Sequence, residues 1–451
     1  MALDPHITLV GAGGMSFGPT MVNDVIRTPA LAGARLVLHD VDEQRLRRAY
    51  AFASKLNAAA GAPVRLDLST DPAAALTGAD FVISSAEFGR FEYRRQDYEV
   101  PNRFGARQIN GENGGPGAVF HSLRSITNTL SICRSVEEHC PDAFLVNLSN
   151  PLSRVALAVN RATSLRNVSM CHEMPNGIYR LSKFLKVDHH DIEATASGIN
   201  HFTFFTEMRH RRTGEDLLAR LRELFARPSW DYSPQKVRAV QAAQRFALTG
   251  ALADELYMPL VVHVVRTYGL VPCSIDSHIG EYLPFTADVA DYYPVRVDVM
   301  EKFSRFTERL SSWVGRTTVP LPLHKVGHSG EEVVPILAAL WTGETTRIMA
   351  MNVPNEGFVP NLPEGAIVEV GGTVDADGLH PDRVPPLDPQ VTEWTLPQLD
   401  LQEKIVQSAL TGDRDLAFDA LVEDPLTPDD PAACRAMFDE LCRLQAAHLP
   451  F

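Results

Sequence analysis

A strand, a glycine-rich turn and a helix follow one another early in this chain, and that order limits the fold more than any other feature. Residues 7–10 are β-branched or apolar, residues 11–14 read Gly-Ala-Gly-Gly, and apolar residues recur at helical spacing over 21–26. A second apolar run ends at Asp40 and precedes another helical pattern. The sequence therefore predicts a βαβ unit.

The same alternation continues downstream. Apolar runs over residues 80–84 and 143–147 predict strands, and residues 120–138 between them predict a long helix. Strands that are apolar throughout and separated by helices are typical of parallel sheets with both faces covered. We therefore predict an α/β fold with an N-terminal, Rossmann-type, doubly wound parallel sheet.

The pattern changes after residue 171. Strands are predicted near residues 192–197 and 202–209, followed by long helical stretches and one more strand over 366–370. A chain of 451 residues is long enough for two domains. We predict a Rossmann-like domain over residues 1–195 and a C-terminal α+β domain over residues 196–451.

The glycine turn and Asp40 together predict a dinucleotide site. Gly11 and Gly13, with Gly14 beside them, let the backbone turn tightly and approach a pyrophosphate, although the third glycine of the usual fingerprint is missing. A carboxylate at Asp40 accepts hydrogen bonds from a ribose diol and repels a 2′-phosphate, which favours NAD over NADP. The alternatives are a turn that binds nothing and an Asp40 that only caps the next helix.

Charge and composition exclude several partners. Lys and Arg number 42 against 56 Asp and Glu, a formal net charge of -14, so the protein repels polyanions and no nucleic acid is expected as a partner. No apolar run reaches the roughly 18 residues that span a bilayer, and no secretory leader is visible, so we expect a cytoplasmic protein without membrane contact. The six cysteines are scattered, which predicts reduced thiols.

Three polar clusters border predicted strand ends, at residues 111–117, 171–173 and 198–201. Strand carboxyl ends form the ligand crevice of a doubly wound sheet, so we expect the clusters to converge on the nucleotide. A thiolate from Cys171 and an imidazole from His201 suit a borderline divalent metal. A buried thiol and a hydrogen-bonded core histidine are the structural alternatives.

A set of motifs, spread in order over most of the chain, carries a resemblance to a known family. The motifs lie at residues 7–13, 91–105, 110–117 with 123–126, 147–151, 171–172, 198–201, 276–282 and 352–363 with 368–370. Together they resemble glycoside hydrolase family 4, the NAD-dependent and metal-dependent glycosidases. The nucleotide domain of that family is similar to that of lactate and malate dehydrogenases.

The resemblance implies hydrolysis through a transient oxidation. Hydride passes from sugar C3 to NAD, the ketone acidifies the C2 proton, a base removes it, and the aglycone leaves by elimination. Water then adds and the hydride returns. The resemblance also implies a divalent metal, which we expect to be Mn²⁺, on Cys171 and His201, and a homodimer or homotetramer. The residues expected to bind NAD are Gly11, Gly13, Gly14, Asp40 and Asn147.

The acid and the base depart from the family pattern. In several relatives an aspartate that follows the ligand cysteine protonates the leaving group, whereas this chain has His172 and then Glu173 there. Either residue serves as the acid in our interpretation, or else orients Cys171. For the base we favour Asp276, in a region where phospho-sugar members often use a tyrosine. Two tyrosines close in sequence are alternatives, Tyr257 and Tyr268.

Four residues are implied in substrate binding: Arg94, Glu112, Asn150 and His278. Arg94 stands where members that cleave 6-phosphorylated sugars carry a phosphate-binding arginine. The Cys-His pair at residues 171–172 instead resembles the branch that acts on unphosphorylated α-galactosides, α-glucosides and α-uronides. We therefore predict an unphosphorylated α-glycoside substrate, with a hexuronide kept open because an arginine also suits a carboxylate. A 6-phospho-glycosidase is the alternative within the family.

Two rival classes share part of the pattern. An NAD-dependent hydroxy-acid dehydrogenase has the same nucleotide domain, but it accumulates NADH and needs neither a metal nor a Cys-His pair. A non-catalytic NAD sensor binds the nucleotide without turnover. For His278, a purely structural hydrogen bond is the alternative to a role at the substrate or the metal.

Overall fold

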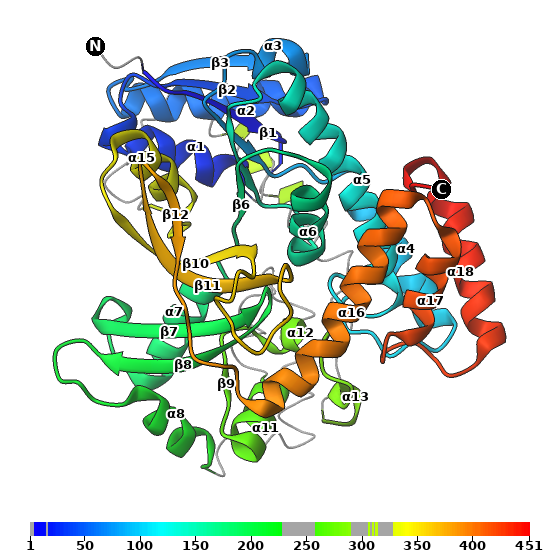
Figure 1. Cartoon of the computed structure of the whole chain (residues 1–451). Helices are drawn as coiled ribbons and strands as arrows, with labels where there is room; N and C mark the ends of the chain where they lie inside the picture. Colours follow the sequence, from blue (N-terminus) through cyan, green and yellow to red (C-terminus); the bar gives the residue numbers. More distant parts are fainter. Residues whose placement is uncertain are drawn as a thin grey trace.

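One mixed sheet of twelve strands runs through the part of the chain that the structure describes. The computed structural model describes residues 4–14, 17–227, 258–289, 305–306, 309–310, 312–313 and 328–451. Helices lie on both sides of the sheet, and further helices stand beside it (Figure 1). Among these residues, no helix is long and apolar enough to cross a membrane.

The first half of the sheet is parallel, with strand order β3-β2-β1-β4-β5-β6. Its strands are β1 (His6–Val10), β2 (Arg35–His39), β3 (Arg65–Ser69), β4 (Phe81–Ser84), β5 (Phe144–Asn147) and β6 (Asn167–Ser169). Ile7 and Leu9 pack in one hydrophobic cluster, whereas Val10 packs in another. Because alternate residues of a strand face opposite sides, both faces of this sheet carry a core. The predicted fold class is confirmed.

Helices cover each face of the parallel half. The first core contains residues of α1 (Gly18–Arg27) and α2 (Glu43–Ala59). The second core contains residues of α3 (Pro72–Leu76), α5 (Pro116–His139) and α6 (Leu152–Ala162). Strands β1, β2, β4 and β5 are buried at almost every position, which explains why their sequences are largely apolar, whereas β3 at the edge of the sheet is more exposed.

The second half of the sheet is antiparallel and continues from the first. Its strands, in spatial order, are β10 (Thr346–Pro354), β11 (Ile367–Asp375), β7 (Ile192–Ile199), β8 (Phe202–His210) and β9 (Val271–Pro272), with β12 (Gly378–Pro381) paired to β11. The two halves join where Asn352 of β10 pairs with Ser169 of β6. Residue 195 lies inside β7, and the division into domains at that residue stays a prediction.

The remaining helices flank the sheet. They are α4 (Arg90–Arg103), α7 (Glu173–Leu185), α8 (Leu217–Phe225), α11 (Pro259–Tyr268), α12 (Asp276–Ile279), α13 (Thr286–Val289), α15 (Val333–Thr342), α16 (Pro389–Thr411), α17 (Arg414–Glu423) and α18 (Pro431–Gln445). The C-terminal helices α16 to α18, orange to red in Figure 1, stand beside α4 and α5 of the first half. The C-terminal helices therefore pack beside α4, the helix that contains the predicted substrate-binding residue Arg94.

Candidate active site

The glycine turn between β1 and α1 has the geometry of a nucleotide cradle. Gly11 adopts φ +83°, and a Cβ there would lie 2.9 Å from the backbone of Ala86. The backbone N–H of Gly13 donates to the carboxylate of Asp40 at 2.9 Å. The cap of α2 is Asp42, whose carboxylate accepts from Arg45 N–H at 3.0 Å, so Asp40 is not the helix cap. Asp40 therefore faces the turn, as a ribose-binding carboxylate does.

Gly18 stands where a close approach of the helix to the turn requires a glycine, as the third glycine of the usual fingerprint does. Helix α1 begins at Gly18, and a Cβ there would lie 2.5 Å from the carbonyl oxygen of Ala12. Only glycine allows the helix to start this close to the turn. A hollow of about 400 Å³, open to solvent and lined in part by Gly13, Gly14 and Gly18, lies beside this start. The sequence analysis did not assign Gly18 because it lies farther from Gly13 than the usual dinucleotide fingerprint requires.

Cys171 and His201, the predicted metal ligands, lie side by side. The sulfur of Cys171 is 3.5 Å from Nε2 of His201. A carboxylate oxygen of Glu173, predicted as an acid, is 3.8 Å from the same nitrogen. The three donor atoms all lie within 4.8 Å of one another. A thiol, an imidazole and a carboxylate at this separation fit one borderline divalent cation, with room left for substrate oxygens.

Strand ends and a hairpin bring these three residues together. Cys171 follows β6, and Glu173 is the first residue of α7. His201 lies in the two-residue turn between β7 and β8, where Ile199 pairs with Phe202. Its φ of +64° is uncommon for a residue other than glycine and indicates a turn held by its surroundings. The imidazole is thus fixed by the hairpin rather than by a mobile loop.

The protonation states of the ligands depend on burial. Burial raises the pKa of the Cys171 thiol well above its ordinary value, and the carboxylates of Glu369 and Glu173 raise it further. Burial lowers the pKa of His201 to about 4, helped by the charge of His278. The imidazole is therefore neutral at pH 7, as a ligand must be, and the thiol needs a bound cation to become a thiolate.

His278 forms a buried ion pair next to this cluster. Its Nδ1 lies 2.7 Å from the carboxylate of Glu173, and its ring stacks on that of His201 at 4.0 Å with a 7° tilt. Burial alone would lower the pKa of His278, but the charge of Glu173 outweighs it and raises that pKa to about 9. In turn, although burial opposes ionisation, His278 holds the pKa of Glu173 well below its usual range. Glu173 is therefore ionised near neutral pH, a state that suits a metal ligand, and its role as the acid stays a prediction.

His172, the other predicted acid, differs from Glu173 in both contact and charge. Its Nδ1 lies 3.0 Å from the carboxylate of Glu331, and its side chain is 42% exposed. Burial would lower the pKa of His172, but Glu331 outweighs it and raises that pKa above its ordinary value. Of the two predicted acids, His172 is the one whose pKa is shifted in the direction that favours the protonated form. Phe17, which follows the glycine turn, contacts its ring at 6.0 Å between centroids.

Three of the predicted substrate-binding residues form one hydrogen-bonded group. Asn150 donates to the carboxylate of Glu112 at 3.1 Å, and Arg94 lies 3.6 Å from the same carboxylate and donates to Asn110 at 2.7 Å. Burial alone would raise the pKa of Glu112, but the charges of Arg94 and His201 lower it to about 2. The Oδ1 atom of Asn150 is buried and has no hydrogen-bond partner among the described residues. It is an acceptor that a sugar hydroxyl can satisfy.

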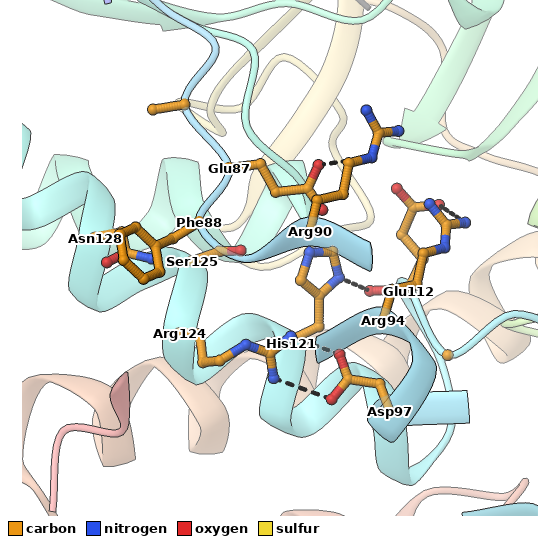
Figure 2. A pocket seen from close by; sticks show the side chains of 12 residues that line it. Glu87, Phe88, Arg90, Arg94, Asp97, Glu112, His121, Arg124, Ser125 and Asn128 are labelled. Atoms are coloured by element: carbon orange, nitrogen blue, oxygen red, sulfur yellow. Dashed lines mark hydrogen bonds and ion pairs between the residues drawn. The ribbon is translucent and has the colours of Figure 1, made fainter. Parts of the chain in front are cut away.

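A pocket of about 430 Å³, open to solvent, adjoins this group between α4 and α5 (Figure 2). Figure 2 shows Arg94 beside Glu112 at one side of the pocket and Arg124 beside Asp97 at another. Each of the three arginines that line the pocket faces a carboxylate: Arg90–Glu87 at 3.0 Å, Arg94–Glu112 at 3.6 Å and Arg124–Asp97 at 2.5 Å. The charges of these side chains therefore balance within the pocket lining.

Two residues that the sequence analysis did not assign hold the loop before α5. The carboxylate of Glu281 accepts from the backbone N–H groups of Glu112 and Asn113 at 2.8 and 2.9 Å. The Asn113 side chain lies 3.0 Å from Nδ1 of His201. Burial and the charge of Glu112 raise the pKa of Glu281 to about 7. Glu281 stands in the motif at 276–282, which was the available signal for its role.

Other predicted residues have structural contacts. Both carboxylate oxygens of Asp276 accept from α11, from Leu260 N–H at 2.8 Å and Val261 N–H at 2.9 Å. Asp276 as the base stays a prediction, and it requires that the carboxylate leave this helix end. Asn147 is buried, and its amide donates to Ser169 Oγ at 3.1 Å. Its role toward NAD also stays a prediction.

The structure describes only one of the two alternative bases, Tyr268. The Tyr268 ring packs edge-on against Trp394 with 4.9 Å between centroids. Tyr257 lies outside the described residues. The identity of the base therefore stays a prediction.

Comparisons with known proteins agree with the fold and the motifs. The model of the family 4 glycosyl hydrolases matches residues 6–187, and the model of their C-terminal domain matches residues 196–427. An α-glucosidase of Erwinia rhapontici is 31% identical over 449 residues, which cover 96% of this chain and 95% of that protein.

Solved structures share the fold. A 6-phospho-α-glucosidase from gut microorganisms, solved in complex with NAD and Mn²⁺, has a TM-score of 0.84 at 22% identity and covers 99% of both chains. Malate dehydrogenase from Plasmodium falciparum has a TM-score of 0.50 at 13% identity, covering 92% of this chain and 99% of that chain. The predicted likeness to malate dehydrogenase is thus confirmed for the fold. With both family models matched in sequence order, the chain belongs to the family 4 glycosyl hydrolases.

Proposed function

We propose that the chain hydrolyses the α-glycosidic bond of an unphosphorylated, neutral sugar, with NAD and Mn²⁺ as cofactors. The carrying observation is the donor set of Cys171, Glu173 and His201, whose atoms lie within 4.8 Å of one another. This set adjoins His172, whose ring contacts Phe17 just after the glycine turn. Family membership favours this function over the dehydrogenase and the sensor.

NAD fits the residues around the turn. Gly11, Gly13 and Gly18 leave space that any Cβ would fill, and Asp40 offers a carboxylate for a ribose diol. Gly14 belongs to the same turn and lines the hollow beside α1. When bound, NAD accepts a hydride from the sugar and later returns it.

The metal fits the donor set. Cys171, His201 and Glu173 would hold it, with Glu173 added here to the two ligands that the sequence predicts. When bound, it supplies the positive charge that makes the thiol a thiolate and stabilises negative charge on sugar oxygens. The adjacent pair of Glu173 and His278 orients the carboxylate toward that position.

The substrate is bound by the group around Glu112. Its ionised carboxylate accepts hydrogen bonds from sugar hydroxyls, and Asn150 offers a buried acceptor that lacks a partner among the described residues. His172 stands as the proton donor to the departing oxygen. We favour a neutral sugar because Arg94 already faces Glu112 and Asn110, which leaves less of its charge for a phosphate or a carboxylate.

The test is a panel of 4-nitrophenyl α-glycosides with NAD and Mn²⁺. The α-glucoside, the α-galactoside, the α-galacturonide and the 6-phosphorylated α-glucoside are compared. We expect cleavage of an unphosphorylated neutral member, loss of cleavage when either cofactor is omitted, and no accumulation of NADH. Faster cleavage of the 6-phosphorylated α-glucoside than of every unphosphorylated member would contradict the substrate assignment.

Two further measurements probe the mechanism. Replacing Cys171 with Ser removes the thiolate ligand, so metal-dependent cleavage should fall at least about a hundredfold. Deuterium at sugar C2 should give a primary isotope effect if removal of the C2 proton limits the rate of turnover. The cytoplasmic location and the homodimeric or homotetrameric state stay predictions.

A further inference from the structure

The segment 328–332 is tied to two separate elements of the fold, and we call it the strap. At one end, the backbone N–H of Ser329 donates to the buried carboxylate of Asp24 in α1 at 3.0 Å. At the other end, the carboxylate of Glu332 accepts from Met349 N–H in β10 at 2.9 Å. Its course between α1 and β10 is therefore fixed at both ends.

Between these ties, Glu331 faces His172. The carboxylate of Glu331 lies 3.0 Å from Nδ1, and its side chain is 11% exposed, while the imidazole is 42% exposed. The Nδ1 atom itself is buried, and its contact with Glu331 is an ion pair that lacks the geometry of a hydrogen bond. The exposed part of the ring is therefore its other edge, which carries Nε2. Glu331 holds one nitrogen and leaves the other open.

The open edge of His172 lies between the two predicted cofactor sites. Phe17, next to the glycine turn, contacts the ring on one side. Cys171 precedes His172 in the chain, and the imidazole interacts electrostatically with Glu173 and His278 of the metal cluster. A sugar that bridges the nucleotide and the metal would lie within this same region.

We propose that Glu331 is a positioning residue that turns Nε2 of His172 toward the glycosidic oxygen. This inference rests on the proposed function. In the elimination step, the electron pair left at C2 after proton removal forms the C1=C2 double bond, and the C1–O bond breaks. The electrons of that bond stay on the oxygen, which takes the proton from Nε2. His172 then regains a proton from water. The His172–Glu331 pair thereby replaces the single aspartate of other members.

A comparison of two leaving groups distinguishes this positioning role of Glu331 from a purely structural role. A 4-nitrophenolate departs without a proton, whereas an alkoxide needs one. With the sugar that the wild type cleaves, Glu331→Ala should lower kcat for the methyl glycoside at least about tenfold more than kcat for the 4-nitrophenyl glycoside, with KM unchanged. Glu331→Gln keeps an acceptor for Nδ1–H and should restore most of the difference.

His328→Ala is the matched control, because it removes the contact of 3.7 Å between His328 Nδ1 and the Asp24 carboxylate at the α1 end of the strap and leaves the Glu331–His172 pair in place. It should change the two rates by the same factor. Equal losses on both glycosides for Glu331→Ala, or the tenfold difference in His328→Ala, would overturn the proposal.

A second readout does not depend on turnover. In protein labelled with ¹⁵N-histidine, the Nδ1–H signal of His172, identified by its loss in His172→Gln, should be present in the wild type and in Glu331→Gln. It should shift or broaden in Glu331→Ala. An unchanged signal in Glu331→Ala would overturn the role of Glu331. A wild type that cleaves neither glycoside would contradict the proposed function alone, and the NMR comparison would still decide the contact.

Discussion

Cys171, Glu173 and His201 differ in how the protein prepares them for a cation. His201 is neutral because burial lowers its pKa to about 4, and Glu173 is ionised because His278 offsets its burial. The Cys171 thiol is the exception, since its pKa lies well above the ordinary value. Metal binding must therefore release a proton from the sulfur, and the affinity should rise with pH.

Glu173→Gln removes an anionic ligand and should weaken Mn²⁺ binding about 10-fold to 100-fold, measured by titration calorimetry. The control is Asp188→Asn, in an exposed group with His189 and His190 that has a similar donor set. That variant should bind Mn²⁺ at the active site as the wild type does. Unchanged affinity in Glu173→Gln would remove Glu173 from the ligand set.

At the scale of elements, the ends of strands and helices determine where the site forms. The proposed metal ligands come from the end of β6, the start of α7 and the turn between β7 and β8. The proposed sugar-binding group comes from α4, from the loop before α5 and from residues that follow β5. The candidate functional residues thus lie mostly at or near the ends of strands and helices, while residues inside these elements form the hydrophobic core.

The start of α1 gives a prediction about NAD. In Gly18→Ala the new Cβ would lie 2.5 Å from the Ala12 carbonyl oxygen, so the turn and the helix must separate. We expect NAD affinity, measured by fluorescence titration, to fall at least about tenfold. In the control Gly61→Ala, the residue has φ +86° and nothing within 4 Å. That variant should lose about 1 kcal/mol of stability and keep its NAD affinity. Equal NAD affinity in both variants would contradict the role of Gly18.

The attachment of the strap to β10 gives a prediction about pH. Burial raises the pKa of Glu332 to about 7 from an ordinary 4.5, although N–H groups of Met349 and Ala350 oppose the rise. Between these pH values the folded protein binds more protons than the unfolded chain, so this group lowers the free energy of unfolding as pH rises. Glu332→Gln should therefore gain stability relative to wild type between pH 5 and pH 8, by up to about 3 kcal/mol. Urea unfolding at both pH values measures the difference, and a constant difference would count against the raised pKa.

Sequence periodicity predicted the elements that bury a regular apolar pattern. The units β1–α1 and β2–α2 belong to that class. Helix α4 was not recognised as a helix because it buries only Asp97, Val100 and Pro101. Strand β10 was not predicted either; its register shifts against β11, which breaks the two-residue alternation.

The sequence also predicted part of the candidate site. Cys171 and His201 stand at predicted strand ends, where a parallel sheet brings residues together. Glu281 and Glu331 reach the same region from distant parts of the chain through buried contacts that no local pattern encodes. Gly18 was missed because its spacing from Gly13 departs from the usual fingerprint. The order of strands and turns along the sequence therefore predicted the candidate ligands. The residues that hold them are brought there by contacts between segments that are distant in the sequence.

The C-terminal helices support the loop between α4 and α5, which carries Glu112. Gln445, the last residue of α18, donates to the Asp97 carboxylate in α4 at 2.8 Å. The Asp97 carbonyl accepts from Gln108 at 2.7 Å, and Gln108 in turn accepts from Gly117 N–H at 2.9 Å. The C-terminal helices are therefore continuous, through hydrogen bonds, with the loop that carries Glu112.

The buried pair of Arg124 and Asp97 lies at the centre of this arrangement. The two side chains are 6% and 2% exposed, with Nη2 and Oδ2 2.5 Å apart. Arg124→Met leaves the carboxylate buried without its cation, so the free energy of unfolding should fall by about 3–5 kcal/mol in urea titrations. Arg124→Met with Asp97→Leu removes both charges and should recover part of that loss. Arg414→Ala is the control, because its pair with Asp439 is about half exposed and should contribute less than about 1 kcal/mol. If Arg124→Met costs no more than Arg414→Ala, the C-terminal helices do not depend on the buried pair, and the loop that carries Glu112 is held by other contacts, such as that of Glu281 with Asn113 N–H.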